Sequence, residues 1–161
     1  RIPEWAGAAR TVRVNGGAPV VPERGGYHAL RAEWKPGDVV DLDLAFELRV
    51  WAGEEECSGK VSVFRGPLVL AYDARFNELN PDQLPTLDAS KLEFVPEPFE
   101  GPIEPWLVGT LRSGDAAFRV CDLAGAGQTG NHYVTWFKAE NAPAPPVPGQ
   151  TREGAKGFRF R

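Results

Sequence analysis

The clearest pattern in the chain is a strict alternation of apolar and polar residues from Val39 to Trp51. Apolar side chains occupy every second position from Val40 to Val50, and most positions between them carry charged residues such as Asp41 and Arg49. A helix would scatter the apolar residues around its circumference, whereas a strand collects them on one side. The pattern therefore predicts a strand with one buried face.

Shorter stretches of the same kind recur along the chain, separated by turns rich in glycine and proline. Asn15-Gly16-Gly17 and Lys35-Pro36-Gly37-Asp38 are typical turn sequences, because glycine accepts positive φ and proline presets φ for a turn. The further predicted strands are Thr11–Asn15, Ala18–Val21, Tyr27–Trp34, Lys60–Phe64, Leu68–Tyr72, Trp106–Leu111, Ala116–Leu123 and His132–Lys138. Of these, Leu68–Tyr72 is continuously apolar and is expected to be a buried strand. This spacing predicts an all-β chain, an antiparallel β-sandwich with jelly-roll or immunoglobulin-like layers.

The middle of the chain breaks the alternation. Residues 73–105 are rich in proline and acidic residues and predict a long excursion over the sandwich, with a helical turn near Asn80–Leu84. We therefore predict one β-sandwich module over residues 1–161. It comprises core strands in 1–72, the excursion 73–105, returning strands in 106–138, and a proline-rich tail 139–161 with an edge strand at Phe158–Arg161.

Composition narrows the function classes. The 161 residues are 42% hydrophobic, which is enough for one domain with a core. A net charge of -4 argues against binding to nucleic acid, and no apolar run reaches the roughly 20 residues that cross a bilayer. The chain has no methionine and opens on Arg1-Ile2-Pro3-Glu4-Trp5, from which we expect a module of a longer protein.

Two cysteines, Cys57 and Cys121, do not form a zinc motif or a disulfide framework. We favour free thiols, and a bridge between them stays open. No metal or cofactor is predicted for this chain.

Several motifs suggest chemistry but have simpler interpretations. The segment from Gly125 to Gly130 matches GxGxxG, yet a strand rather than a helix is predicted after it, so we expect a hairpin loop instead of a nucleotide site. The acidic groups at Glu54–Glu56 and at Asp41 and Asp43 are interpreted as solvated surface, because neither a partner carboxylate nor enough metal-binding oxygens can be identified.

The two histidines suggest no catalytic assembly. His28 shares parity with Leu30 and Trp34, which predicts a position at the edge of the core, and His132 begins a predicted strand. No serine or cysteine can be matched with a histidine and an acid, so no catalytic residue is assigned.

The five tryptophans offer two alternatives. Trp34 and Trp136 share parity with core residues and are expected to pack, whereas Trp5, Trp51 and Trp106 are expected at exposed positions. Together with Tyr133 they are candidate contacts for carbohydrate or for a neighbouring domain. We favour the domain interface, because an exposed aromatic patch is typical of a surface that another domain covers.

Motifs in the first 72 residues resemble the C-terminal β-sandwich of the beta-L-arabinofuranosidase family of glycoside hydrolases, family 127 and its relatives. The motifs that carry the resemblance are Arg1-Ile2-Pro3-Glu4-Trp5-Ala6, Val14-Asn15-Gly16, Gly26-Tyr27 with Arg31 and Trp34, Gly37-Asp38-Val39-Val40, Leu42-Asp43-Leu44, and Arg65-Gly66-Pro67-Leu68-Val69-Leu70-Ala71. Cys121–Gly127 and Tyr133–Trp136 resemble the late hairpin of the family. Residues 73–115 and 139–161 are not distinctive.

The resemblance implies a bacterial protein that processes plant-type glycans, with a catalytic (α/α) barrel before the sandwich. In that family a cysteine nucleophile, zinc-binding cysteines and glutamates lie in the barrel, and none is transferred to Cys57, Cys121 or any glutamate here. The expected function is that of a non-catalytic accessory sandwich that supports the barrel. The alternatives are an autonomous carbohydrate-binding module and an enzyme with paired carboxylates.

The resemblance also implies strands upstream of Arg1-Ile2-Pro3 that would leave a sheet edge unpaired. We therefore predict that the edge near Arg1–Trp5 pairs with a second copy, with another chain, or with Phe158–Arg161.

Overall fold

The strands of this chain form two separate sheets joined end to end. The computed structural model describes residues 1–100 and 105–144. The strands are β1 (Ala6–Val14), β2 (Val40–Phe46), β3 (Leu48–Ala52), β4 (Lys60–Arg65), β5 (Leu68–Asp73), β6 (Leu87–Asp88), β7 (Leu92–Pro96), β8 (Val108–Ser113), β9 (Ala116–Asp122), β10 (Tyr133–Val134) and β11 (Phe137–Glu140). Four short 3₁₀ helices connect them: η1 (Glu55–Cys57), η2 (Ala74–Phe76), η3 (Pro81–Gln83) and η4 (Ala89–Lys91).

The small sheet consists of β1 and β2, which pair in antiparallel register with Val12 opposite Leu42. Val12 also bridges to Val20, which lies beyond the turn at Asn15-Gly16-Gly17. Its core contains few residues: the buried side chains Ile2, Ala6 and Val12, against which Trp5, Leu30 and Leu44 pack.

The large sheet has the strand order β6-β11-β4-β5-β9-β8-β7, with β3 on the free edge of β4 and β10 on β5. All of these pairings are antiparallel except that of β11 with β6. The sheet curls until β6 reaches β8: the Ser113 hydroxyl accepts a hydrogen bond from the Asp88 amide at 2.6 Å and donates to the Asp88 carbonyl at 3.0 Å. The curled sheet therefore encloses its own core.

The core of the large sheet is well packed. Three rings lie at its centre: Phe118 is 6.0 Å from Tyr72 and 5.3 Å from Phe137, measured between ring centroids. The buried cluster comprises Val61, Val63, Leu70, Tyr72, Leu87, Leu111, Phe118, Val120 and Phe137. The large sheet thus has a hydrophobic core independent of the small one.

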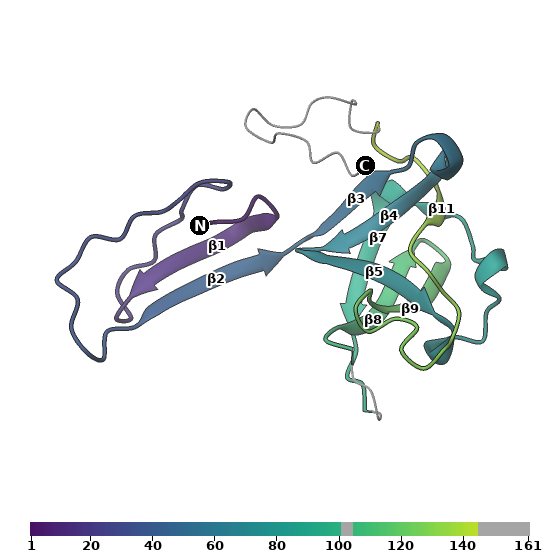
Figure 1. The fold of residues 1–161 in the computed structure, drawn as a ribbon. Coiled ribbons are helices and arrows are strands. Elements are labelled where there is room, and N and C mark those ends of the chain that lie inside the picture. The colour runs from purple at the N-terminus through teal and green to yellow at the C-terminus, as the bar shows by residue number, and fades with distance from the viewer. Residues whose placement is uncertain (101–104, 145–161) are drawn as a thin grey trace, which may run out of the picture.

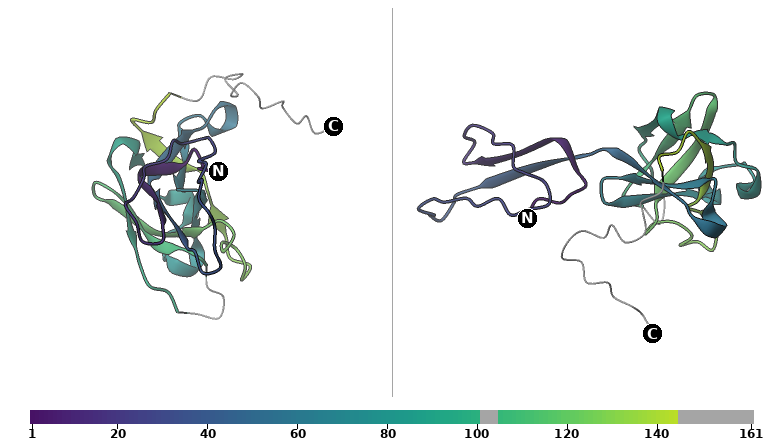
Figure 2. Two further views of the ribbon diagram at one scale, coloured as in Figure 1. Left: turned by 90° about the vertical axis from the view of Figure 1, so that its left-hand side faces the viewer. Right: turned by 90° about the horizontal axis from the view of Figure 1, so that it is seen from above.

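The two sheets lie at opposite ends of an elongated molecule, and the chain passes from one to the other where β2 runs into β3 (Figures 1 and 2). The described part of the chain has no helix of sufficient length and apolarity to span a membrane.

The predicted all-β class and the antiparallel sandwich are confirmed. The alternating segment Val39–Trp51 is not one strand, however, because it divides at Glu47 into β2 and β3, which belong to different sheets. Its predicted core face is half open, since Val40 and Leu42 are 45% and 48% exposed.

The prediction of a strand at Tyr27–Trp34 is wrong. This segment is irregular, Tyr27 is 88% exposed, and only Leu30 packs against the small core. Trp34 and Trp136 are also not packed as predicted, with exposures of 48% and 36%. Residues 27–34 show the alternation of a strand, but no neighbouring strand among the described residues pairs with their backbone.

The excursion 73–105 contains more structure than predicted. The helical turn near Asn80–Leu84 is confirmed as η3, but β6 and β7 were missed, and β7 pairs with β8 along its whole length. The predicted edge strand Phe158–Arg161 lies outside the described residues, as does most of the predicted tail.

The edge at Arg1–Trp5 is paired within the chain. The Ile2 amide donates to the Gly26 carbonyl at 2.9 Å, and the Gly25 amide donates to the Ile2 carbonyl at 2.9 Å. Pairing of this edge with a second copy or another chain stays a prediction.

Leu111 provides a test of the core of the large sheet. Because Leu111 is fully buried in the cluster, Leu111→Ala should lower the free energy of unfolding by about 2–5 kcal/mol. Leu123→Ala is the matched control: Leu123 is 39% exposed, and its truncation should cost less than about 1 kcal/mol. Equal losses in urea unfolding would contradict this assignment of the core.

Candidate functional site

Two of the four candidate aromatic residues meet at the junction between the sheets. Trp5 lies edge-on to Phe46, with ring centroids 5.1 Å apart, and Phe46 lies 6.0 Å from Trp106. Trp5 is half-buried, while Trp106 is 72% exposed. We call Trp5, Phe46 and Trp106 the junction aromatics. They link the N-terminal segment, the end of β2 and the chain before β8.

The other two candidates lie elsewhere. Trp51 on β3 is 53% exposed and Tyr133 on β10 is 45% exposed. Neither forms a ring contact with the junction aromatics. The four predicted residues thus lie at exposed or half-buried positions, but they do not form one platform.

Hydrogen bonds around Glu47 and Gly66 also stabilise the junction. The Glu47 carboxylate accepts a hydrogen bond from the Ala8 amide at 2.7 Å, and the Glu47 carbonyl accepts one from the Gly66 amide at 3.0 Å. Arg49 donates to the Gly66 carbonyl at 2.9 Å. Gly66 has φ of 57°, and a Cβ on it would lie 2.7 Å from the Phe46 ring, so a side chain is excluded here. Gly66, which belongs to the predicted Arg65-Gly66-Pro67 turn, therefore leaves the space that the Phe46 ring occupies.

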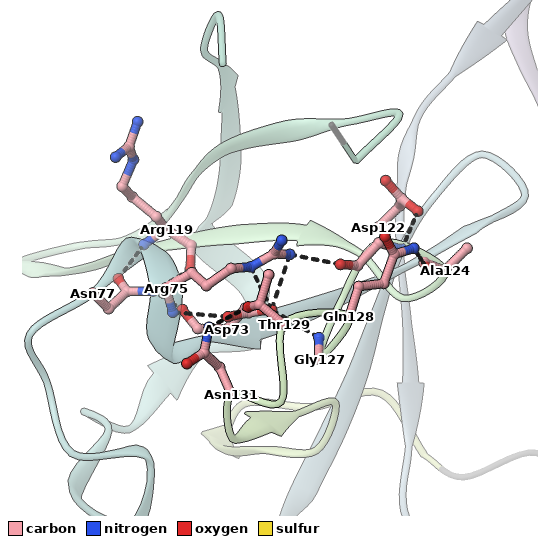
Figure 3. A network of polar contacts seen from close by, with 11 residues as sticks. Asp73, Arg75, Asn77, Arg119, Asp122, Ala124, Gly127, Gln128, Thr129 and Asn131 are labelled. Atoms are coloured by element: carbon pink, nitrogen blue, oxygen red, sulfur yellow. Dashed lines mark hydrogen bonds and ion pairs between the residues drawn. The ribbon is translucent and has the colours of Figure 1, made fainter. Parts of the chain in front are cut away.

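A second cluster of polar groups surrounds the glycine-rich loop after β9 (Figure 3). Asp73 is fully buried and accepts from the Arg75 amide at 2.8 Å and from the Gly127 amide at 2.8 Å. Its carboxylate is also 3.1 Å from the Arg75 guanidinium, which donates in turn to the Gly125 carbonyl at 2.6 Å. The carboxylate is thus satisfied by one cation and two amides, an arrangement that fixes the loop onto the end of β5.

Neighbouring groups extend this network. The Asn77 side chain donates to the carbonyls of Asp73 and Arg119 at 3.0 Å and 2.9 Å, and it accepts from the Arg119 amide at 2.8 Å. Arg119 pairs with Glu97 at 2.8 Å. Hydrogen bonds from Thr110 and Arg119 lower the pKa of Glu97, so this carboxylate is charged near neutral pH.

Asp122 has the same kind of role at the start of the loop. Its carboxylate accepts from the Leu107 amide at 3.0 Å and from the Gly125 amide at 2.9 Å. Both buried carboxylates, Asp73 and Asp122, are therefore used to hold backbone. Every buried side-chain nitrogen and oxygen of the described residues has a hydrogen-bond partner.

The glycine loop is a connection between strands, as predicted. Residues 125–130 lead into β10, not into a helix that would receive a phosphate. The prediction missed the buried partners of the loop, Asp73 and Arg75, which lie about 50 residues earlier in the chain. No local sequence signal marks this pairing.

The remaining candidates occupy ordinary positions. Glu54–Glu56 are exposed in and beside η1, and Asp43 receives a hydrogen bond from Thr11 at 3.1 Å. His28 is half-buried beside the small core, and His132 is exposed. Over residues 1–100 and 105–144, no three histidines, cysteines or carboxylates gather in a group that could hold a metal ion.

Both cysteines are free thiols in this structure. Cys57 is half-buried and Cys121 is fully buried in β9. Burial, with added repulsion from Asp73 and Asp122, raises the pKa of Cys121 to about 12. A buried thiol with a raised pKa is protonated near neutral pH, which disfavours reaction as a thiolate.

Comparisons with known proteins agree with this architecture. Residues 1–46 match the family model described as the beta-L-arabinofuranosidase, GH127 middle domain. The resemblance to the GH127 family is confirmed. The matched segment is the small sheet with its loops, and it is similar to part of the middle domain of these glycoside hydrolases.

Solved structures extend the likeness to both sheets. A GH127 β-L-arabinofuranosidase from Geobacillus stearothermophilus T6 is similar with a TM-score of 0.64 and 24% identity, over 87% of this chain and 26% of its own. A glycoside hydrolase gives a TM-score of 0.67 at 24% identity, over 86% and 27%. A GH127 β-arabinofuranosidase gives 0.61 at 21% identity, over 82% and 23%.

The chain therefore spans about a quarter of the length of these structures, with which it shares its fold. No curated protein matches the chain significantly.

Replacement of Asp73 tests the buried network. Asp73→Ala leaves Arg75 and the Gly127 amide without their acceptor, and we expect a loss of about 3–5 kcal/mol in the free energy of unfolding. Lys91→Ala is the matched control, because it breaks the exposed Lys91–Asp88 pair and should cost less than about 1 kcal/mol. Amide exchange at Gly127 should accelerate in the first variant alone. A loss at Asp73 as small as that at Lys91 would show that the network is dispensable.

Thiol titration tests the assignment of the cysteines. In the native chain at pH 8, a disulfide-forming reagent should modify Cys57 and leave Cys121 unreacted, because Cys121 is buried with a raised pKa. Denaturation should release the second thiol, and Cys57→Ser should abolish the native reaction. Two fast thiols in the native chain, or none after denaturation, would contradict the structure.

Proposed function

We propose that this chain is a non-catalytic accessory part of a GH127-type glycoside hydrolase and that its small sheet packs against other parts of that enzyme. The observation that carries the proposal is the open apolar face of the small sheet. Val40 and Leu42, which share one face of β2, are 45% and 48% exposed, and Val20, which bridges to Val12, is 50% exposed. A two-stranded sheet is marginal in water unless a further layer covers it.

The large sheet supports the same role in a different way. It has a complete core, and its buried carboxylates Asp73 and Asp122 are both bound to backbone amides. Glycosidases use two carboxylates that face a shared space occupied by the sugar. Asp73 and Asp122 do not meet that requirement, so the chemistry is assigned to another domain of the parent enzyme.

The name of the matched family model supports the identity of the parent. The similar structures named as a β-L-arabinofuranosidase and a β-arabinofuranosidase are matched over only 26% and 23% of their own length, which leaves room for a catalytic barrel. A β-L-arabinofuranoside is accordingly the substrate class that we propose for the whole enzyme.

Substitution at the open face tests the proposal. Leu42→Asp in the 161-residue chain should cost only about 1 kcal/mol, because Leu42 is already half exposed. In the longer enzyme the same change should lower the melting temperature by several degrees and reduce hydrolysis of an aryl β-L-arabinofuranoside. Asp41→Asn, on the opposite face of β2, is the control and should be silent in both. Equal effects of Leu42→Asp in the short and long chains would contradict the proposal.

Experiments on the 161-residue chain alone distinguish the accessory role from the two alternatives, an enzyme and a carbohydrate-binding module. It should not hydrolyse the aryl arabinofuranoside, and millimolar arabinofuranose should leave its tryptophan fluorescence unchanged. Turnover by the chain alone would establish an enzyme instead. Fluorescence quenching that is lost in Trp51→Ala or Trp106→Ala would establish a module that binds neutral carbohydrate.

A further inference from the structure

Two lysines lie side by side on the outer face of the large sheet. Lys60 on β4 and Lys138 on β11 are direct partners in the antiparallel ladder, so their side chains leave the same face. The neighbouring pair, Val61 and Phe137, is buried in the core, which places the two lysines on the opposite face. Like charges directly opposite one another destabilise a sheet. An anion placed between the two ammonium groups would relieve this repulsion.

These lysines line a small hollow that also has an aromatic wall. The lining includes Trp136, Pro81, Leu84 and Asp82, and the hollow measures about 150 Å³. Trp136 is 36% exposed, although its position in the sequence predicted a packed residue. Pockets for drug-sized ligands start at roughly 300 Å³, so this hollow suits a single small ring.

The charges around the hollow leave the lysine pair available. Among the described residues, neither Lys60 nor Lys138 forms an ion pair, either with Asp82 of the same hollow or with another carboxylate. Glu140 lies two positions after Lys138 but acts on Lys91, whose pKa it helps to raise. On a chain with a net charge of -4, this is a local concentration of positive charge beside an indole ring.

We propose that this hollow binds a carboxylate-bearing sugar ring, a hexuronate residue of an acidic glycan. Lys60 and Lys138 donate charge-assisted hydrogen bonds to the carboxylate, and the apolar face of the ring lies on Trp136. The Asp82 carboxylate accepts hydrogen bonds from ring hydroxyls. Trp5, Trp51, Trp106 and Tyr133 do not line this hollow, and the proposal does not depend on the role proposed for the whole chain.

Titration with three ligands tests the proposal on the 161-residue chain. Trigalacturonate should bind with a dissociation constant on the order of 1 mM and should shift the Trp136 indole resonance in NMR spectra. Galactose, which has the ring but no carboxylate, and inorganic phosphate, which has charge but no ring, should each bind at least about tenfold more weakly. Equal binding of galactose or of phosphate would overturn the assignment to an acidic sugar.

Variants on the exposed face identify the residues involved. Lys60→Gln, Lys138→Gln and Trp136→Leu should each weaken trigalacturonate binding about tenfold, and raised salt should weaken it in the unaltered chain. Lys35→Gln and Trp34→Leu are matched controls, because they change an exposed lysine and an exposed tryptophan in the segment before β2, at the small-sheet end of the molecule. Amide spectra confirm that each variant is folded. Undiminished binding in the three hollow variants, or no binding by the unaltered chain at 20-fold higher ligand (about 20 mM), would overturn the proposal.

Discussion

A two-stranded sheet cannot bury both of its faces against itself, and this constraint governs the molecule. In the large sheet, seven successive strands curl until β6 meets β8, and the apolar face is enclosed. In the small sheet, the residues outside β1 and β2 that cover the apolar core are Ile2, Trp5 and Leu30. Val40 and Leu42 therefore stay half exposed at positions whose alternation is typical of a core strand. The mismatch between an interior-type sequence and an open surface is the physical basis for assigning an accessory role.

The contacts at the junction explain how the two sheets are joined in one chain. β2 ends at Phe46, and the next residue, Glu47, bonds to both sheets. Its carboxylate accepts a hydrogen bond from Ala8 of β1, and its carbonyl accepts one from Gly66 of the β4–β5 turn. Phe46 lies on Gly66 where a side chain would not fit, and it contacts both Trp5 and Trp106. Short contacts on both sides of Phe46 and Glu47 thus join the small sheet to the large sheet.

Much of the fold could be predicted from local patterns and turn chemistry, because alternation marks β4, β8 and β9 and a continuous apolar run marks β5. The division of Val39–Trp51 could not be predicted, since residues on both sides of Glu47 continue the same alternation and only tertiary pairing separates them. The short strand β7 was not predicted, because Pro96 and the neighbouring prolines are typical of loops, although this segment pairs with β8. The irregular course of Tyr27–Trp34 reflects the absence of a pairing strand, which the pattern of a single segment does not reveal.

For the candidate residues too, local features could be predicted from the sequence, whereas contacts between distant residues could not. Exposure of Trp51, Trp106 and Tyr133 could be predicted from position and parity, but the contact of Trp5 with Trp106 through Phe46 joins residues about 100 positions apart. The Asp73–Gly127 bond spans 54 positions and has no local signature. Residues whose roles depend on such distant partners become visible only in the folded chain.

Hydrogen exchange of the backbone amides tests the central claim most directly. In the 161-residue chain, the amides of Val12, Leu42 and Leu44 in the small sheet should exchange orders of magnitude faster than those of Leu111 and Val120 in the large sheet. In the longer enzyme the two sets should be protected to a similar degree. Equal protection of both sheets in the isolated chain would contradict the account, because the small sheet would then be stable without a covering domain.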